Sequence, residues 1–164
     1  ETASTANMTA PFVILDTQNA AAMASLHAHT FPPSEVWSEK SFADTLAQPT
    51  SLALGIEADD QLIAFILLLR TGPDAELLTR PDARRKGHAD ALISSGCALL
   101  GSYGTDRLLL EVAEDNHAAR ALYERKGFAV DGRRKGYYAR PDGNMCDGLL
   151  MSRSVAGQKG ESKA

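Results

Sequence analysis

Cysteine is scarce in this 164-residue chain, in which Cys97 and Cys146 are the two examples. Two cysteines are too few for a disulfide framework, and these two lack the paired spacing of a zinc site. This usage is typical of a reducing compartment, so we expect a cytoplasmic protein.

Long apolar runs and an excess of positive charge are also missing. The longest apolar run, 62–69, has eight residues, whereas a membrane-spanning helix needs roughly 20. Lysine and arginine number 17 against 21 aspartate and glutamate residues, and the net charge is -4. The chain therefore lacks the positive field on which non-specific nucleic-acid binding depends. We expect a soluble protein that binds neither a membrane nor a nucleic acid.

Both ends of the chain are polar. Residues 1–7 precede Met8, and we expect them to be a remnant of the expression vector. Residues 154–164 have Val155 as their single bulky apolar side chain, so we expect a flexible tail. The chain is 44% hydrophobic, which is enough to build one domain at 8–153 without disulfides or metals.

Hydrophobic patterning predicts a mixture of strands and helices. Strands are expected at 12–15, 51–56, 61–70, 75–79, 107–112, 128–132 and 144–153, and helices at 17–29, 35–48, 87–100 and 116–126. Asp16 or Thr17, Ser34 and Asp115 are the expected helix caps, and the acidic turn 57–60 predicts an antiparallel hairpin. Tyr137 and Tyr138 fall in the loop between the last two strands. The pattern indicates an α/β (α+β mixed) fold, in which helices pack on the faces of one mixed sheet.

The first candidate site is the basic sequence 84–89, Arg-Arg-Lys-Gly-His-Ala, at the entrance to a helix. Unpaired backbone N–H groups and the helix dipole favour a phosphate there, and Gly87 allows it to approach the main chain. The alternative is a solvated basic surface. The stretch matches neither the nucleotide phosphate loop nor the dinucleotide-binding motif.

The second candidate is Glu111, which interrupts an apolar strand at 108–112. An unpaired carboxylate in a buried strand is costly and tends to take up a proton, which suits a general base. The alternative is a glutamate that reaches solvent or pairs with an arginine.

The third candidate is the pair Asn116 and Tyr123, seven residues apart and therefore on nearly the same face of a helix. An amide and a phenol would then line one groove. The alternative is ordinary structure, with Asn116 in a helix cap and Tyr123 in the core.

Other chemically active side chains have no partners at a recognisable spacing. His27 and His29 lie two residues apart on a helix and face different directions, so we expect both to be structural. His88 and His117 lie next to the proposed groove but have no serine or cysteine partner. Cys97 belongs to an apolar helix stripe and is expected in the core.

Together these residues resemble the GNAT superfamily of acetyl-CoA-dependent N-acetyltransferases, and within it the RimI-type ribosomal-protein-alanine N-acetyltransferases. The resemblance runs from about Trp37 to Met151. It rests on 84–89, which is similar to the family's Arg/Gln-x-x-Gly-x-Gly/Ala loop; on Leu110-Glu111-Val112, Asn116, Ala119, Leu122-Tyr123 and Gly127-Phe128, which match a family signature at the same spacings; and on 133–138 and 147–151, which are similar to the family's Arg-x-x-Tyr-Tyr and Asp-Ala-x-x-Met stretches.

The resemblance implies a GNAT-type single domain with a twisted, mostly antiparallel sheet of about six to seven strands, and acetyl-CoA as the cofactor. It implies that Glu111 is the proton acceptor, that Tyr123 is the proton donor, and that Tyr137 and Tyr138 join Glu111 in binding the acceptor. The residues that it implies at the cofactor are Leu78, Thr79, Arg80, Arg84, Arg85, Lys86, Gly87, His88, Ala89, Asn116 and Tyr123.

Three positions depart from the family pattern. Thr79 runs directly into Arg80, so the strand before the basic loop is about three residues shorter than usual. His88 and Ala89 replace an apolar residue and the second glycine of the loop. Gly148 stands where alanine is usual, which we expect to be a minor change.

The predicted activity is acetyl transfer to the α-amino group of a protein N-terminus, with the N-terminal alanine of a small-subunit ribosomal protein as the expected acceptor. Glu111 would remove the amine proton, a backbone N–H would stabilise the oxyanion, and Tyr123 would protonate the sulfur of the released CoA. Two alternatives remain open. The acceptor is a small-molecule amine or a lysine side chain, or the chain is a CoA-binding interaction module that has lost catalysis. The sequence predicts no metal and assigns no oligomeric state.

Overall fold

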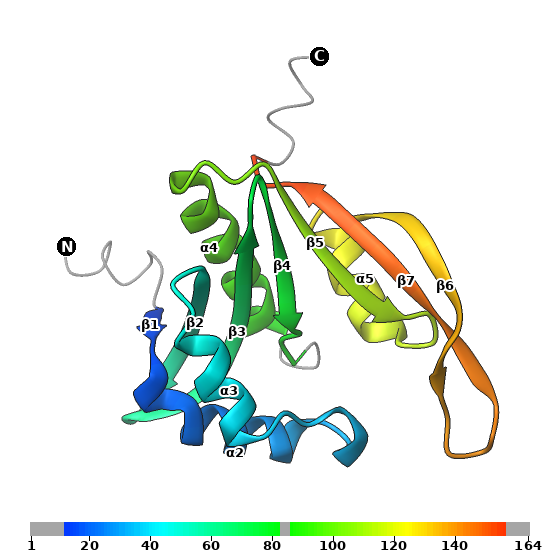
Figure 1. Cartoon of the computed structure of the whole chain (residues 1–164), viewed down its shortest axis with the longest axis horizontal. Coiled ribbons are helices and arrows are strands. Elements are labelled where there is room, and N and C mark those ends of the chain that lie inside the picture. The colour runs from blue at the N-terminus through cyan, green and yellow to red at the C-terminus, as the bar shows by residue number, and fades with distance from the viewer. Residues whose placement is uncertain (1–11, 83–85, 157–164) are drawn as a thin grey trace. The chain divides into compact units, whose positions relative to one another are not determined.

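The computed structural model describes residues 12–82 and 86–156 (Figure 1). Arg84, Arg85 and the predicted vector remnant 1–7 therefore lie outside the described residues. The elements are β1 (Val13–Leu15), η1 (Thr17–Asn19), α2 (Ala20–Thr30), η2 (Pro33–Glu35), α3 (Glu39–Leu46), β2 (Ser51–Ala58), β3 (Gln61–Thr71), β4 (Asp74–Thr79), α4 (Lys86–Ser102), β5 (Arg107–Ala113), α5 (His117–Arg125), β6 (Ala129–Ala139) and β7 (Met145–Ser154).

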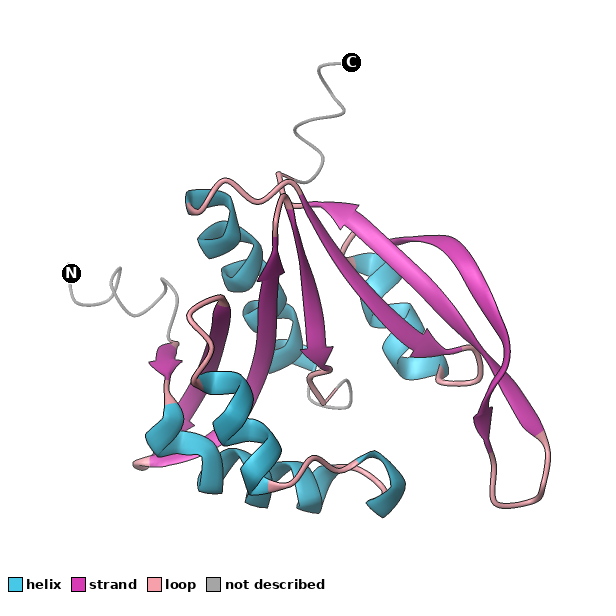
Figure 2. Cartoon of the chain, viewed as in Figure 1, coloured by secondary structure: helices cyan, strands magenta, loops and turns pink. Residues whose placement is uncertain are grey.

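The seven strands form one sheet in the order β1-β2-β3-β4-β5-β7-β6. Strands β1 and β2, β2 and β3, β5 and β7, and β6 and β7 pair in antiparallel fashion, whereas β4 and β5 are parallel. The predicted mixed, mostly antiparallel sheet is confirmed. Figure 2 shows the strands of the chain in magenta and its helices in cyan.

Contacts divide the chain into two compact units, the first made of the chain up to Leu69 with Leu78–Gly96, the second of Arg70–Leu77 with the chain from Cys97. The first unit has a hydrophobic core in which α2 and α3 pack on each other and on β2 and β3. Phe42 lies at its centre with a fully buried ring. The buried core residues are Leu15, Ala20, Met23, Phe42, Ala53, Phe65 and Leu67.

The predicted hairpin is confirmed, and its acidic turn is left-handed. β2 and β3 pair from Ser51 opposite Leu69 to Ala58 opposite Gln61. Asp59 and Asp60 have φ angles of 52° and 63°, a conformation that aspartate tolerates and that two-residue hairpin turns require.

Two of the predicted helix caps are wrong by a few residues. The Asp16 side chain caps η1 as expected, because it accepts a hydrogen bond from the backbone N–H of Gln18. However, Ser38 rather than Ser34 caps α3, and Asn116 rather than Asp115 caps α5. Several polar residues lie close together at both places, and the backbone geometry rather than the residue type decides which one caps.

The second unit is built on β5, β7 and β6. Alternate residues of β5 are buried, and two of them, Leu110 and Val112, lie opposite the buried residues Met151 and Leu149 of β7. Helix α5 ends as expected at Gly127, whose φ of 93° is left-handed. The N–H of Phe128 then bonds the carbonyl of Tyr123 at 2.9 Å, which closes the helix end.

Two expectations about the C-terminal part are wrong. The predicted flexible tail begins too early, because Ser154 belongs to β7 and Val155 is buried, with its N–H bonded to the carbonyl of Asp106. Tyr137 and Tyr138 lie on β6 rather than in a loop. Glycines, charged residues and two shifts of register hide this strand from pattern analysis, because they interrupt the alternation of apolar and polar residues.

In the described ranges, no helix is long and apolar enough to span a membrane. The same residues contain no group of histidine, cysteine, aspartate and glutamate side chains arranged to hold a metal ion.

Candidate active site

Glu111 lies on β5 with its side chain on the opposite face from Leu110 and Val112, because neighbouring residues of a strand point to opposite faces. Its side chain is 20% exposed. The guanidinium of Arg134 on β6 donates two hydrogen bonds to it, from Nε to Oε2 at 3.2 Å and from Nη2 to Oε1 at 2.8 Å. The hydrogen bond to Glu111 raises the pKa of Arg134 above its ordinary value.

The expectation of an unpaired carboxylate at position 111 is therefore wrong. The alternative that the sequence left open, a pair between Glu111 and an arginine, is the one the structure contains. Both carboxylate oxygens accept a hydrogen bond, so the orientation of the group is fixed by a two-point contact.

Tyr137 and Tyr138 lie beside this ion pair. The Arg134 guanidinium stacks on the Tyr137 ring at 3.7 Å from the ring centre. The two tyrosine rings meet edge to face, 5.0 Å apart, although successive strand residues normally point to opposite faces. A shift of register between Arg134 and Tyr138 accounts for this contact. The structure thus brings together the predicted base Glu111 and the two tyrosines predicted to bind the acceptor.

Tyr123, the predicted proton donor, is 1% exposed on α5. Its ring packs against Phe128 with the ring centres 5.6 Å apart. The ring is thus a core side chain, as the alternative interpretation expected.

Asn116 caps α5, since its side-chain oxygen accepts a hydrogen bond from the backbone N–H of Ala119 at 3.1 Å. This is the structural role that the sequence left open. The side-chain NH₂ group of a capping asparagine remains a donor, so the cap and the predicted contact with the cofactor are compatible.

The predicted phosphate site lies at the start of α4, a helix of 17 residues. Gly87 is exposed, and a Cβ atom built on it would meet nothing within 4 Å. The space above this first helical turn is open to a ligand. Ala89 is buried, so it can offer a ligand only its backbone. Arg84 and Arg85 lie outside the described residues.

The end of β4 holds the other predicted cofactor contacts. Thr79 is 3% exposed, and its hydroxyl has no hydrogen-bond partner within the part of the chain that the structure describes. The Leu78 side chain packs on the core of the first unit, so only its backbone is free for a ligand. Arg80 pairs with Glu35 at 2.7 Å and stacks on Phe31 at 4.4 Å.

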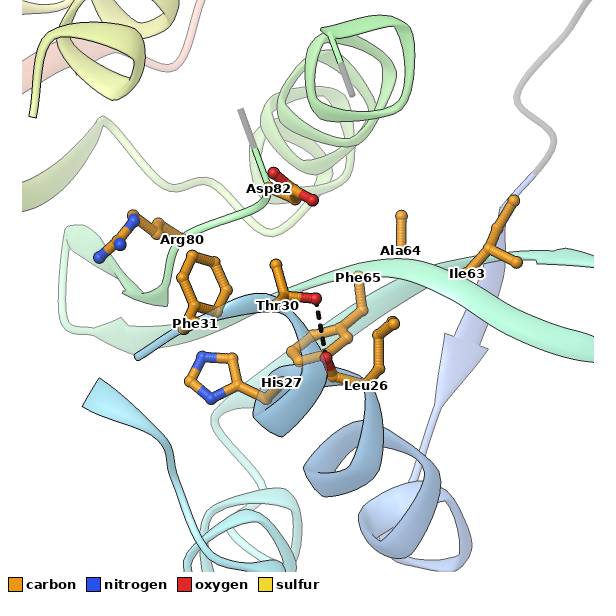
Figure 3. A pocket seen from close by; sticks show the side chains of 9 residues that line it. All are labelled: Leu26, His27, Thr30, Phe31, Ile63, Ala64, Phe65, Arg80 and Asp82. Carbon is orange, nitrogen blue, oxygen red and sulfur yellow. Dashed lines mark hydrogen bonds between the residues drawn. The ribbon is translucent and has the colours of Figure 1, made fainter. Parts of the chain in front are cut away.

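A small cavity that sequence analysis missed lies in the first unit, between the end of α2, the start of β3 and the segment after β4 (Figure 3). Its volume is about 50 Å³, and His27, Phe31, Phe65 and Arg80 are among its lining residues. His27 is buried, and the pKa of its imidazole is lowered to about 4, first by burial and then by the charge of Arg80. Residues so far apart in the sequence give no signal that they share a cavity.

A charged groove in the second unit was also missed. Asp115 accepts hydrogen bonds from Nε and Nη2 of Arg140, which lower the pKa of its carboxyl. Asp147 accepts from the backbone N–H of Gly136 and from Arg133, and these bonds lower its pKa as well. The charged side chains of this groove therefore bond one another, and the bonds of Asp147 help to hold β6 and β7 in register.

Comparison with protein families and known proteins agrees with this fold. The model of the acetyltransferase (GNAT) family matches residues 15–128. The ribosomal protein bS18-alanine N-acetyltransferase of Salmonella typhimurium is 33% identical over 132 residues, which are 79% of this chain and 85% of the relative. The Escherichia coli enzyme of the same name has the same identity and coverage.

Solved structures share the fold. The crystal structure of the ribosomal-protein-S18-alanine N-acetyltransferase from Escherichia coli aligns with a TM-score of 0.74 and 31% identity, covering 88% of this chain and 94% of that one. NAA60 of Arabidopsis thaliana, solved in complex with acetyl-CoA, aligns with a TM-score of 0.71 and 19% identity over 89% of this chain and 98% of its own.

The chain belongs to the acetyltransferase (GNAT) family. It is an acetyl-CoA-dependent N-acetyltransferase, and its relatives of about one-third identity modify a ribosomal protein.

Proposed function

We propose that this enzyme acetylates the α-amino group of a protein N-terminus, and that the acceptor is the N-terminal alanine of a ribosomal protein. The observation that supports the proposal most is the similarity to bS18-alanine N-acetyltransferases, which extends over 79% of the chain. Under this proposal the enzyme works in the cytoplasm, where ribosomal proteins are made.

Two features of the chain fit acetyl-CoA. The first turn of α4 lies at the positive end of a helix dipole, and Gly87 leaves the space above it open. The hydroxyl of Thr79 is buried without a partner among the described residues, and such groups are normally satisfied. We propose that the pyrophosphate binds at Gly87, and that Thr79 bonds the pantetheine chain. Bound acetyl-CoA supplies an activated acetyl thioester.

We assign the acid–base chemistry to the second unit. Glu111 accepts the proton that the α-amine must lose, directly or through one water, so that the nitrogen can attack a carbonyl carbon. Tyr123 donates its phenolic proton to the leaving sulfur. Tyr137, half of which is exposed, offers a ring beside Glu111 on which the acceptor chain can pack.

The proposal is tested by measuring thiol release with acetyl-CoA and three acceptors. One is a peptide that begins with alanine and contains an internal lysine; the second is the same peptide with its N-terminus blocked; the third is a set of small amines. We expect turnover with the first alone. Turnover with the blocked peptide or the amines contradicts the proposed acceptor. Tight acetyl-CoA binding without turnover of any of the three acceptors favours the alternative of an inactive CoA-binding module.

A further inference from the structure

Gly148 is placed where a side chain would collide with the proposed base. In the paired strands it lies on β7 opposite Ala113 of β5 on one side and opposite Arg134 of β6 on the other. A Cβ atom built on Gly148 would lie 2.5 Å from Oε2 of Glu111 and 3.3 Å from Cε2 of Tyr138. An alanine at this position therefore requires the end of the Glu111 side chain to shift from its observed position.

The ion pair between Glu111 and Arg134 joins two strands that are not neighbours in the sheet. Glu111 and Arg134 lie on strands that are both paired with β7 and not with each other. Neighbouring strands are about 4.8 Å apart, so these two backbones are separated by roughly 10 Å. The two side chains meet over β7 beside Gly148, where that strand presents no side chain. Gly148 supplies that opening.

Arg134 is also held from its other side. Its guanidinium stacks on the ring of Tyr137, and an arginine confined between a ring and a carboxylate loses less freedom on bonding than a free one. By contrast, the neighbouring Arg133 turns to Glu114 and Asp147. The two adjacent arginines therefore have separate partners, and only one of them contacts Glu111.

We propose that Arg134 is a positioning residue for Glu111, and that Gly148 is the opening in the sheet that lets it act. Arg134 fixes the orientation of the carboxylate, since it donates a hydrogen bond to each of the two carboxylate oxygens. Arg134 itself moves no proton. The proposal rests on the role of Glu111 as the general base under the proposed function.

The test compares two pairs of variants in the full-length enzyme. Gly148→Ala is matched with Gly132→Ala, because a Cβ atom on Gly132 makes only an ordinary contact of 3.5 Å with Leu150. Arg134→Gln is matched with Arg133→Gln. Gly148→Ala is expected to fold, since the atom that must move is the end of a flexible side chain, and thermal unfolding checks this.

We expect Gly148→Ala and Arg134→Gln each to lower kcat by about tenfold or more, as small displacements of a catalytic group do. KM for acetyl-CoA stays unchanged, and both control variants keep the wild-type kcat. Arg134→Lys restores part of the rate. The double variant, which combines Gly148→Ala with Arg134→Gln, has about the same kcat as either single variant, because both changes disrupt the contact between Glu111 and Arg134.

Three outcomes separate this proposal from the function on which it rests. If Glu111→Gln is inactive and the effects of Gly148→Ala and Arg134→Gln on kcat are not additive, the proposed function and the positioning role both stand. If Glu111→Gln is inactive but Arg134→Gln keeps the wild-type kcat, the positioning role is overturned and the proposed function survives. If Glu111→Gln turns over like the wild type, the base is misassigned and the positioning role falls with it.

One readout needs no acceptor. The Nε–H signal of Arg134 in an NMR spectrum is expected to be protected from exchange in the wild type and in Gly132→Ala. It loses that protection in Gly148→Ala. Equal protection in all three proteins overturns the opening at Gly148, whatever the acceptor is.

Discussion

The imidazole Nδ1 of His27 accepts a hydrogen bond from the backbone N–H of Trp37, over 3.2 Å. This bond joins the last turn of α2 to the segment before α3, and it requires a neutral ring with its proton on Nε2. Phe31, Phe42 and Phe65 surround the same ring, with ring centres 4.7 to 6.2 Å away. The arrangement makes His27 part of the core and not of a metal site.

Acid should therefore destabilise the fold through His27. Its pKa is about 4 in the folded protein against 6.5 for the free group, so the unfolded chain binds the extra proton between these values. The free energy of unfolding falls as the pH drops from about 6.5 to about 4, by roughly 3 kcal/mol at most. Urea unfolding at a series of pH values measures this slope.

The matched variants for that experiment are His27→Gln and His29→Gln. His29 is exposed, so its replacement leaves the slope as it is in the wild type. His27→Gln removes the contribution of the buried imidazole to the slope. An unchanged slope in His27→Gln would show that other groups cause the acid sensitivity.

Phe42 is the side chain whose loss should cost the first unit most. It is fully buried and contacts the rings of Trp37 at 5.2 Å and Phe65 at 5.6 Å. Phe42→Ala is expected to lower the free energy of unfolding by about 3–5 kcal/mol, whereas Phe42→Leu lowers it by less. Equal costs for the two variants, measured by denaturant unfolding, contradict a tightly packed core at this ring.

Tyr123→Phe separates the phenolic hydroxyl from the packing of the ring. The ring contact with Phe128 remains, so far-UV circular dichroism is expected to be unchanged. Loss of a general acid typically costs a factor of about 100 in kcat. Tyr103→Phe, at an exposed tyrosine under the guanidinium of Arg70, is the control and keeps full activity. A fully active Tyr123→Phe enzyme rules out Tyr123 as the proton donor.

Gly87→Glu tests the phosphate site without disturbing the fold. The added side chain has open space around it, and a negative charge at a helix start is favourable for the helix itself. It repels a bound pyrophosphate, so we expect the Kd for acetyl-CoA to rise by about tenfold or more in calorimetry, most at low salt. Ala98→Glu places the same charge on an exposed position later in α4 and leaves the Kd unchanged. If Gly87→Glu and Ala98→Glu bind acetyl-CoA with equal affinity, the pyrophosphate does not bind at Gly87.

Local signals along the sequence predicted much of the fold. The hairpin of β2 and β3 follows from two apolar runs around acidic residues that tolerate a left-handed turn. Gly127 marks the end of α5 because only glycine adopts its φ angle at little cost. The strand β6 was underestimated, since two shifts of register break its alternation.

The partners of the site residues were harder to predict. Glu111 and Arg134 are 23 positions apart, and their contact depends on the register of two strand pairs and on an absent side chain at Gly148. No pattern within one strand carries that information. The family resemblance identified Glu111, Tyr123 and Tyr137 as candidates, whereas the structure was needed to find which of them meet.

The most direct test of the account is the kcat of Glu111→Gln for acetyl transfer to a peptide that begins with alanine. The account predicts a kcat at least about 100-fold below that of the wild type. The melting temperature and the Kd for acetyl-CoA stay at their wild-type values. A Glu111→Gln enzyme that acetylates the peptide at the wild-type rate contradicts it.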